Sequence, residues 1–322
     1  MPAGNEIFYC VFCFEYDIII KIWRSDYLRG YLCLLMTSFL WGTTFVAQMV
    51  GMDDIGPFTY CMGRFVVGFF VVLAIWRALA GQRKKAQQLG QWQSGWKYGI
   101  GAGCIMFVGS ALQQIALLYT TVGKTGFITC LYIILVPLFA KLIGKRIRPE
   151  NWLGAVIALT GLYCLSIKGD LNLNFGDILA FVGAFFWSFH ILFIDRYASR
   201  ADGVEISAAQ IGVCAILNTI ACFLFESFTW QQLVNAAIPI LYAAVLSSGV
   251  AFTLQIIGQQ TAEPAPAAVI MSLESVFGAL GGWLVLGEIM NRTEILGCCL
   301  MLAGMLVTQA GLLLKKTRRP IG

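Results

Sequence analysis

The chain has 322 residues, of which 59% are hydrophobic and only 12% are charged. A soluble domain of this size could not bury so much apolar surface in one core, so the composition indicates an integral membrane protein. The net charge of +5 does not indicate a nucleic-acid partner, because the basic residues are scattered over short connectors and form no single face.

The first 29 residues carry few structural signals. Ile7 to Phe14 are apolar, but acidic residues flank them and no basic region precedes them, so neither a signal peptide nor a full span fits. We expect residues 1–29 to be a surface-lying or disordered tail, or an extension upstream of the true start. Cys10 and Cys13 form a lone CxxC without a second pair or a nearby histidine, which is poor evidence for a metal or redox site.

Ten apolar runs follow, each near the ~20 residues that a helix needs to cross a hydrocarbon core. They lack the alternating polarity of barrel strands, and irregular backbone cannot face lipid, so each is predicted to be a helix. The predicted spans are Gly30–Val50, Pro57–Leu79, Tyr98–Tyr119, Val122–Ile143, Trp152–Ile167, Ile178–Asp195, Ser207–Glu226, Ala237–Gly258, Ala265–Leu286 and Ile295–Leu314.

The distribution of lysine and arginine predicts the orientation. If the N-terminus is cytoplasmic, most of the 22 basic residues fall in cytoplasmic connectors, whereas the outer connectors hold only Lys124, Lys168 and Arg292. This positive-inside bias predicts a multi-pass protein of the cytoplasmic membrane with both termini in the cytoplasm.

The spans form two similar halves. SFLWGTTF in the first half matches AFFWSFHI in the second, which pairs Trp41 with Trp187, and a third-helix match pairs Gln113 with Gln255. The spacing stays at 142 to 146 residues, which indicates an internal repeat.

We therefore predict a first five-helix repeat over residues 30–168, a second over 176–314, and a basic cytoplasmic tail over 315–322. Because five spans is an odd number, the second repeat must enter the membrane from the opposite side. The predicted fold class is an all-α integral membrane protein with ten transmembrane helices in two inverted repeats. Transporters are commonly built this way, with the substrate site between the halves.

Several motifs resemble the EamA branch of the drug/metabolite transporter superfamily. They are SFLWGTTFV in the first helix, Arg64 in RFVVGFF, ALLYTTVGKTGFI leading to Pro137, and SLESVFGALGGWLVLGE. The chain departs from the family pattern at Ser275, where proline is usual, and at Lys145, where an acid is usual. The resemblance covers nearly the whole chain and implies a ten-helix exporter or importer of metabolites.

Three ionisable groups lie deep in the spans, where a charge costs about 2.5 to 3.5 kcal/mol. Arg64 either caps carbonyls or pairs with a neighbouring helix, or it contacts substrate. Glu274 is either a protonated acid that bridges helices or a titrating proton carrier. His190 is either a satisfied core histidine or a group that changes charge between pH 5 and 8.

Aromatic and amide side chains at matching positions of the two halves suggest a shared cavity. Such a cavity suits a small amphipathic or zwitterionic cargo such as an amino acid, and not a polyphosphate, which needs a cluster of arginines and lysines. Bridging between helices is the alternative role for the amides. The predicted substrate-binding residues are Trp41, Thr44, Gln113, Gln114, Tyr119, Trp187, His190, Gln255 and Gln259.

We therefore expect a secondary transporter that exports small metabolites, by proton coupling or as a facilitator, and has no catalytic residue, metal or cofactor. No Walker A motif is present, so ATP would need a partner protein. A membrane-embedded enzyme is the alternative from another class, but HExxH is absent and the single histidine lacks an evident triad partner. A lipid flippase, a membrane sensor and a homodimer are left open.

Overall fold

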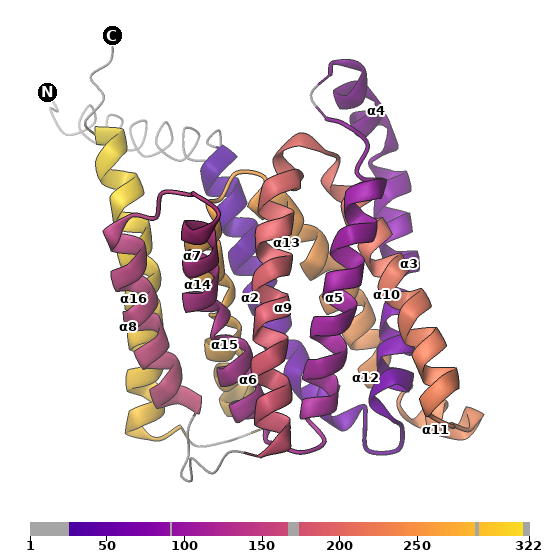
Figure 1. Ribbon diagram of the computed structural model, residues 1–322. Coiled ribbons are helices and arrows are strands. Elements are labelled where there is room, and N and C mark those ends of the chain that lie inside the picture. Colours follow the sequence, from indigo (N-terminus) through magenta and orange to yellow (C-terminus); the bar gives the residue numbers. More distant parts are fainter. Residues whose placement is uncertain (1–25, 91, 167–173, 287–289, 318–322) are drawn as a thin grey trace, which may run out of the picture.

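The computed structural model describes residues 26–90, 92–166, 174–286 and 290–317, so the CVFC pair and most of the predicted N-terminal tail lie outside the described residues. Every element named in the described part is a helix (Figure 1). The elements are α2 (Asp26–Val50), α3 (Pro57–Ala78), α4 (Ala80–Gln88), α5 (Trp96–Ala116), α6 (Val122–Thr129), α7 (Tyr132–Leu142), α8 (Pro149–Ser166), α9 (Phe175–Tyr197), η1 (Ala198–Arg200), α10 (Gly203–Phe225), α11 (Trp230–Asn235), α12 (Ala237–Tyr242), the π-helix η2 (Ala243–Ala251), α13 (Phe252–Gln259), α14 (Pro264–Met271), α15 (Glu274–Leu286) and α16 (Arg292–Thr317).

Seven helical runs of the described residues are long and apolar enough to cross a membrane. An all-α membrane protein is therefore confirmed, whereas the count of ten spans stays a prediction. The other three predicted spans fall on α2, α8 and α16, which have 25, 18 and 26 residues but are not among the seven. The seven runs are Pro57–Ala78, Trp96–Ala116, Gly123–Leu142, Phe175–Arg200, Gly203–Phe225, Ala237–Gln259 and Pro264–Gly281.

Two of the predicted spans are broken in the middle. One is divided into α6 and α7 at residues 130–131, and the other into α14 and α15 at residues 272–273. The two interruptions are 142 residues apart, which is the spacing of the sequence repeat. Broken helices at membrane depth are tolerated where the irregular backbone is buried in protein or lines a cavity.

The first helix of each half packs against the other half. Helix α2 contacts α13, η2, α14 and α15, whereas α9 contacts α5, α6 and α7. The two helices run in opposite directions, since α2 descends from the top of Figure 1 and α9 ascends from the bottom. The halves are therefore interlocked rather than laid side by side.

Ion pairs join α9 to the broken helix of the first half at both ends. Lys124, in α6, lies 3.4 Å from Asp177 in the first turn of α9. Lys145, just after α7, pairs with Asp195 near the end of α9. Because the two pairs lie about five helical turns apart, they hold α9 and the α6–α7 run parallel along their whole length.

Glycines form the contact between α8 and α16. A Cβ atom added at Gly154 would lie 2.6 Å from the Gly304 carbonyl oxygen, and one added at Gly161 would lie 2.6 Å from that of Gly297. The reverse additions, at Gly304 and Gly297, give the same distances. Small residues let these backbones approach where no hydrophobic effect drives helices together.

Glycines at other helix contacts differ in how closely the neighbouring helix approaches. Additions at Gly99 and Gly103 would come within 2.4 and 2.7 Å of side chains of α10, which confirms close packing there. At Gly278 the nearest atom would be 3.4 Å away, so ordinary packing would admit a side chain.

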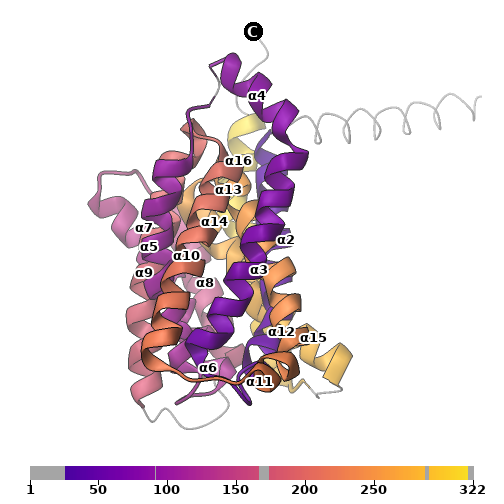
Figure 2. The ribbon, with the colours of Figure 1, turned by 90° about the vertical axis from the view of Figure 1, so that its right-hand side faces the viewer.

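A buried ion cluster fixes the connection from α4 to α5. The Arg83 guanidinium lies 2.6 Å from the Asp202 carboxylate and 2.7 Å from the Glu205 carboxylate. Asp202 accepts hydrogen bonds from the first turn of α10, and Glu205 accepts one from the backbone N–H of Gly95, where α5 begins. The cluster lies at the end of the bundle that carries α4, opposite α11 (Figure 2).

Candidate substrate cavity

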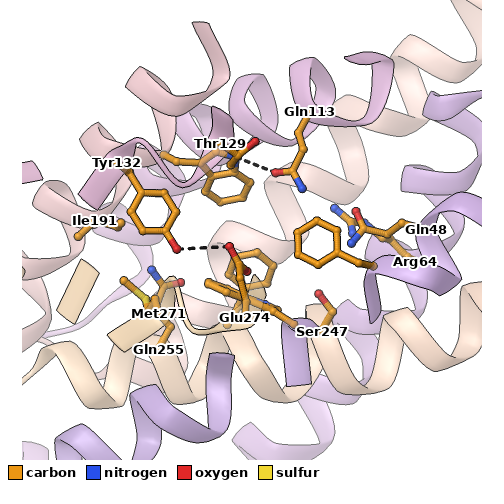
Figure 3. Close-up of a pocket in the computed structure, with 14 residues that line it drawn as sticks. Gln48, Arg64, Gln113, Thr129, Tyr132, Ile191, Ser247, Gln255, Met271 and Glu274 are labelled. Carbon is orange, nitrogen blue, oxygen red and sulfur yellow. Dashed lines mark hydrogen bonds between the residues drawn. The ribbon is translucent and has the colours of Figure 1, made fainter. Parts of the chain in front are cut away.

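A cavity lies among the helices of both halves, with about 530 Å³ of space not filled by atoms, including the part open to its surroundings. Both broken helices contribute to its wall (Figure 3). The lining residues are Trp41, Phe45, Gln48, Arg64, Gln113, Thr129, Tyr132, Trp187, Ile191, Ser247, Phe252, Gln255, Met271 and Glu274.

Most of the lining residues occur as repeat-related pairs. Trp41 with Trp187 and Phe45 with Ile191 are 146 residues apart, and three further pairs are 142 residues apart. Equivalent positions of the two halves therefore converge on one space. The further pairs are Gln113 with Gln255, Thr129 with Met271, and Tyr132 with Glu274.

An aromatic group forms one wall. The Phe252 ring lies between the two tryptophans, with its centroid 4.9 Å from that of Trp41 and 6.1 Å from that of Trp187. The Trp187 indole N–H donates to the Gln113 side-chain oxygen over 2.9 Å. The Trp41 indole nitrogen is buried and has no hydrogen-bond partner among the described residues. The two tryptophans thus share the cavity, and one keeps an unused donor.

Glu274 lies at the break between α14 and α15. Its carboxyl oxygen Oε1 is 3.3 Å from the Tyr132 hydroxyl and 3.3 Å from the Cys130 thiol, both from the opposite broken helix. The Cys130 sulfur is also 3.7 Å from the Ser275 hydroxyl. The side chain of Glu274 is 6% exposed. The contact between the two broken helices is therefore made through hydrogen bonds to a buried acid.

Arg64, from α3, is buried with 4% exposure. The Phe65 ring lies 4.5 Å from its guanidinium carbon. No carboxylate of the described residues lies within ion-pair distance of Arg64, and its Nε has no partner. The structure therefore shows neither the carbonyl cap nor the interhelical ion pair that the sequence suggested for it.

The amide of Gln255 connects this cavity with a second hollow. Gln255 donates to the side-chain oxygen of Gln259 over 3.1 Å, and Gln259 donates to the Ile191 carbonyl over 3.0 Å. Gln259 lines the second hollow and not the first, next to charged residues of the α7–α8 connection. Two ion pairs lie beside this second hollow. One joins Arg148 and Glu263 at 2.9 Å, and the other joins Lys145 and Asp195.

The structure places some of the predicted substrate-binding residues at the central cavity and others away from it. Trp41, Gln113, Trp187 and Gln255 line the central cavity, as do Glu274 and Arg64. Thr44 is fully buried and donates to the Trp41 carbonyl.

The remaining predicted residues do not reach the central cavity. The Gln114 side-chain nitrogen contacts the Met52 sulfur and the Gln48 carbonyl oxygen. Tyr119 is 54% exposed at the end of α5, edge-on to a phenylalanine. His190 is fully buried and shares a 3.0 Å hydrogen bond with Gln210. One ring nitrogen is therefore satisfied as in a core histidine, whereas Nδ1 has no partner among the residues described.

Eight of the lining residues are not in the predicted set. The repeat offered a signal for one of them, because Tyr132 lies 142 positions before Glu274, which the sequence did single out. No pattern marked Ser247 or Phe252. Ser247 is in the π-helix η2, and such segments frequently occur at functional sites. The lining residues outside the predicted set are Phe45, Gln48, Thr129, Tyr132, Ile191, Ser247, Phe252 and Met271.

Comparison with known proteins places the chain among transporters. The model of the EamA-like transporter family matches residues 28–167 and 174–309. An uncharacterized transporter of Archaeoglobus fulgidus is 29% identical over 85% of this chain and 83% of its own length. The uncharacterized inner membrane transporter YedA of Escherichia coli K12 is 24% identical over 79% of this chain and 82% of its own length.

Two further matches bear on cargo and fold. The aromatic amino acid exporter YddG of Salmonella typhimurium is 29% identical over 42% of this chain and 49% of its own length. One crystal structure superimposes with a TM-score of 0.73, covering 90% of this chain and 99% of that chain at 22% identity. At that identity the match supports the fold alone.

Proposed function

Because the chain belongs to the EamA-like transporter family, we propose that it is a secondary transporter that exports small amphipathic metabolites across the cell membrane. The observation that carries the proposal is the central cavity, which repeat-related residues of both halves line in pairs. In inverted-repeat transporters the substrate binds near the midplane between the repeats. The names of the relatives, all transporters, favour this reading over an enzyme.

The proposed topology is ten spans in two inverted repeats with both termini in the cytoplasm. It is supported by the opposite directions of α2 and α9 and by the 142-residue spacing of the two helix breaks. The reciprocal glycine contacts of α8 and α16 supply a third pair of equivalent elements.

The proposed cargo has an apolar or aromatic body and a polar end. Trp41, Trp187 and Phe252 offer ring faces, and Gln113 and Gln255 offer amides that can orient a polar group. The buried Trp41 N–H and the Gln255 Oε1 both lack partners in the part of the chain that the structure describes, so a bound molecule has a donor and an acceptor to satisfy. One relative is named an aromatic amino acid exporter, which agrees with such a cargo.

We propose that cargo enters from the cytoplasm through the second hollow and passes the Gln255–Gln259 pair. The ion pairs Lys145–Asp195 and Arg148–Glu263 join the first half to the second beside this entrance. Rocking of one set of helices against the other would break these pairs and open the entrance, and closing would restore them.

The test is transport and binding by purified, reconstituted protein against a metabolite panel that includes aromatic and aliphatic amino acids. For a compound that binds, Trp187→Ala removes a wall of the cavity and should weaken binding several-fold or more. Trp230→Ala is the matched control, because Trp230 is 76% exposed in α11. If both variants are folded and Trp187→Ala binds the compound as tightly as the wild type, the compound binds at a site other than the central cavity.

A further inference from the structure

Arg64 is the one lysine or arginine among the residues that line the central cavity. A buried charge in a membrane span costs about 2.5 to 3.5 kcal/mol and is ordinarily compensated by a partner. An arginine cannot avoid that cost by losing its proton. The described residues nevertheless give Arg64 no carboxylate and no oxygen acceptor, only the face of Phe65.

The scaffold itself does not require this charge. The residue that follows Arg64 by 146 positions is Gln210 in α10, the equivalent helix of the second half. Gln210 is neutral, fully buried, and hydrogen-bonded to His190 outside the cavity. If the position served only to join helices, an amide with an internal partner would suffice, as it does in the second half.

The charge lies at one end of the cavity. Figure 3 shows Arg64 beside Gln48 on one side and Tyr132 on the other, with Glu274 between. Glu274 is not an ion-pair partner of Arg64, since no contact within 4.0 Å joins them. A molecule in the cavity would therefore meet a fixed cation at one end, aromatic faces along its length, and a separate carboxyl group further on.

We propose that Arg64 binds a carboxylate of the transported molecule and so restricts the cargo to small organic acids and zwitterions with an apolar or aromatic body. This rests on the proposed function and specifies the substrate class of the same site. The planar guanidinium can present two parallel N–H donors to a carboxylate. A bound carboxylate would supply the missing counter-charge. A single arginine does not suit a polyphosphate.

The test compares four probes in binding to the purified wild-type protein: L-phenylalanine, L-phenylalanine amide, 2-phenylethylamine and 3-phenylpropionate. They share one ring, and only the first and last carry a carboxylate. Both carboxylates should bind about tenfold or more tightly than the amide and the amine, because a hydrogen-bonded charge pair is lost without the carboxylate. This comparison needs no variant and does not depend on the folding of one.

Variants then assign the discrimination to the residue. Arg64→Gln should lose about tenfold or more in binding of the carboxylates and leave amide binding unchanged, whereas Arg64→Lys, which keeps the charge but not the planar fork, should lose less. Thermal unfolding monitors the fold of each variant. Equal binding of acid and amide by the wild type, an equal loss of both in Arg64→Gln, or no binding of either carboxylate at millimolar concentration would overturn the assignment. The transporter proposal would survive any of these results if another compound of the metabolite panel were transported.

Discussion

The Tyr132 hydroxyl lies 3.3 Å from the Glu274 carboxyl oxygen, and these two residues occupy equivalent positions of the two halves, 142 residues apart. Each begins the second segment of a broken helix, since α7 starts at Tyr132 and α15 starts at Glu274. The hydrogen bond therefore joins the two breaks to each other inside the cavity. A substitution of either residue would therefore alter the contact between the two halves and the wall of the cavity.

The first prediction concerns proton coupling through Glu274. If this carboxyl carries a proton, Glu274→Gln should abolish gradient-driven accumulation and leave exchange of bound cargo partly intact, because the amide keeps the shape but cannot titrate. The measurement is uptake into proteoliposomes with and without a pH gradient.

Glu150→Gln is the matched control, since Glu150 is exposed at the start of α8. Wild-type pH dependence in Glu274→Gln would rule out the proton role. A fall in thermal stability with coupling intact would instead assign Glu274 to joining the helices. Tyr132→Phe separates the two further, because it removes the hydrogen bond but leaves the acid.

The second prediction concerns the buried cluster around Arg83. Arg83→Met would leave the carboxylates of Asp202 and Glu205 buried without their cation, and it should lower the free energy of unfolding by about 3–5 kcal/mol. Thermal unfolding in detergent measures the effect. Lys84→Met, at the exposed neighbouring position, should change stability little. Equal behaviour of the two variants would show that the cluster contributes nothing measurable.

The third prediction concerns the glycines between α8 and α16. Gly161→Ala places a methyl group 2.6 Å from a backbone oxygen, so the helices must separate, at a cost of about 1–3 kcal/mol. Gly281→Ala makes the same change in α15, where a Cβ atom meets nothing within 4 Å. The melting temperature should fall in the first variant and not in the second. Unchanged stability of Gly161→Ala would mean that the helices adjust freely.

The fourth prediction concerns orientation. In a cysteine-free background, a cysteine at Gln88, exposed at the end of α4, should be shielded from an impermeant thiol reagent in intact cells. A cysteine at Gln231 in α11, at the opposite end of the bundle, should be labelled. Labelling at Gln88 but not at Gln231 would reverse the orientation.

The sequence predicted where helices lie better than where they break. The span predicted over residues 122–143 coincides with α6 and α7, but the hydrophobic run continues through Cys130 and Leu131 without a breaking residue. The only proline of this span is Pro137, and it lies inside α7 rather than at the interruption. The hydrophobic run is continuous across the break, so hydrophobicity cannot predict where the helix is interrupted.

The sequence predicted the cavity-lining residues best at positions matched by the repeat. It predicted them worst where residues were selected only because their side chains are polar. Trp41 with Trp187 and Gln113 with Gln255 came from matched positions, and all four line the cavity. His190 was predicted from its ability to change charge and from its place on one helix face with Trp187. In the structure its side chain is fully buried and hydrogen-bonded to Gln210 in α10, and it does not line the cavity.

The first helix of each half packs against the other half, and this determines the order in which helices find their partners during biosynthesis. As the chain leaves the ribosome, α5, α6 and α7 are inserted before α9 exists to cover them, and α2 waits longer still for α13 to α15. During that interval the interior faces of the first half meet lipid or a membrane chaperone instead of protein. The cavity cannot close until α15 has been made, so a product truncated before Glu274 would lack the wall that joins the two halves, however well its own helices had inserted.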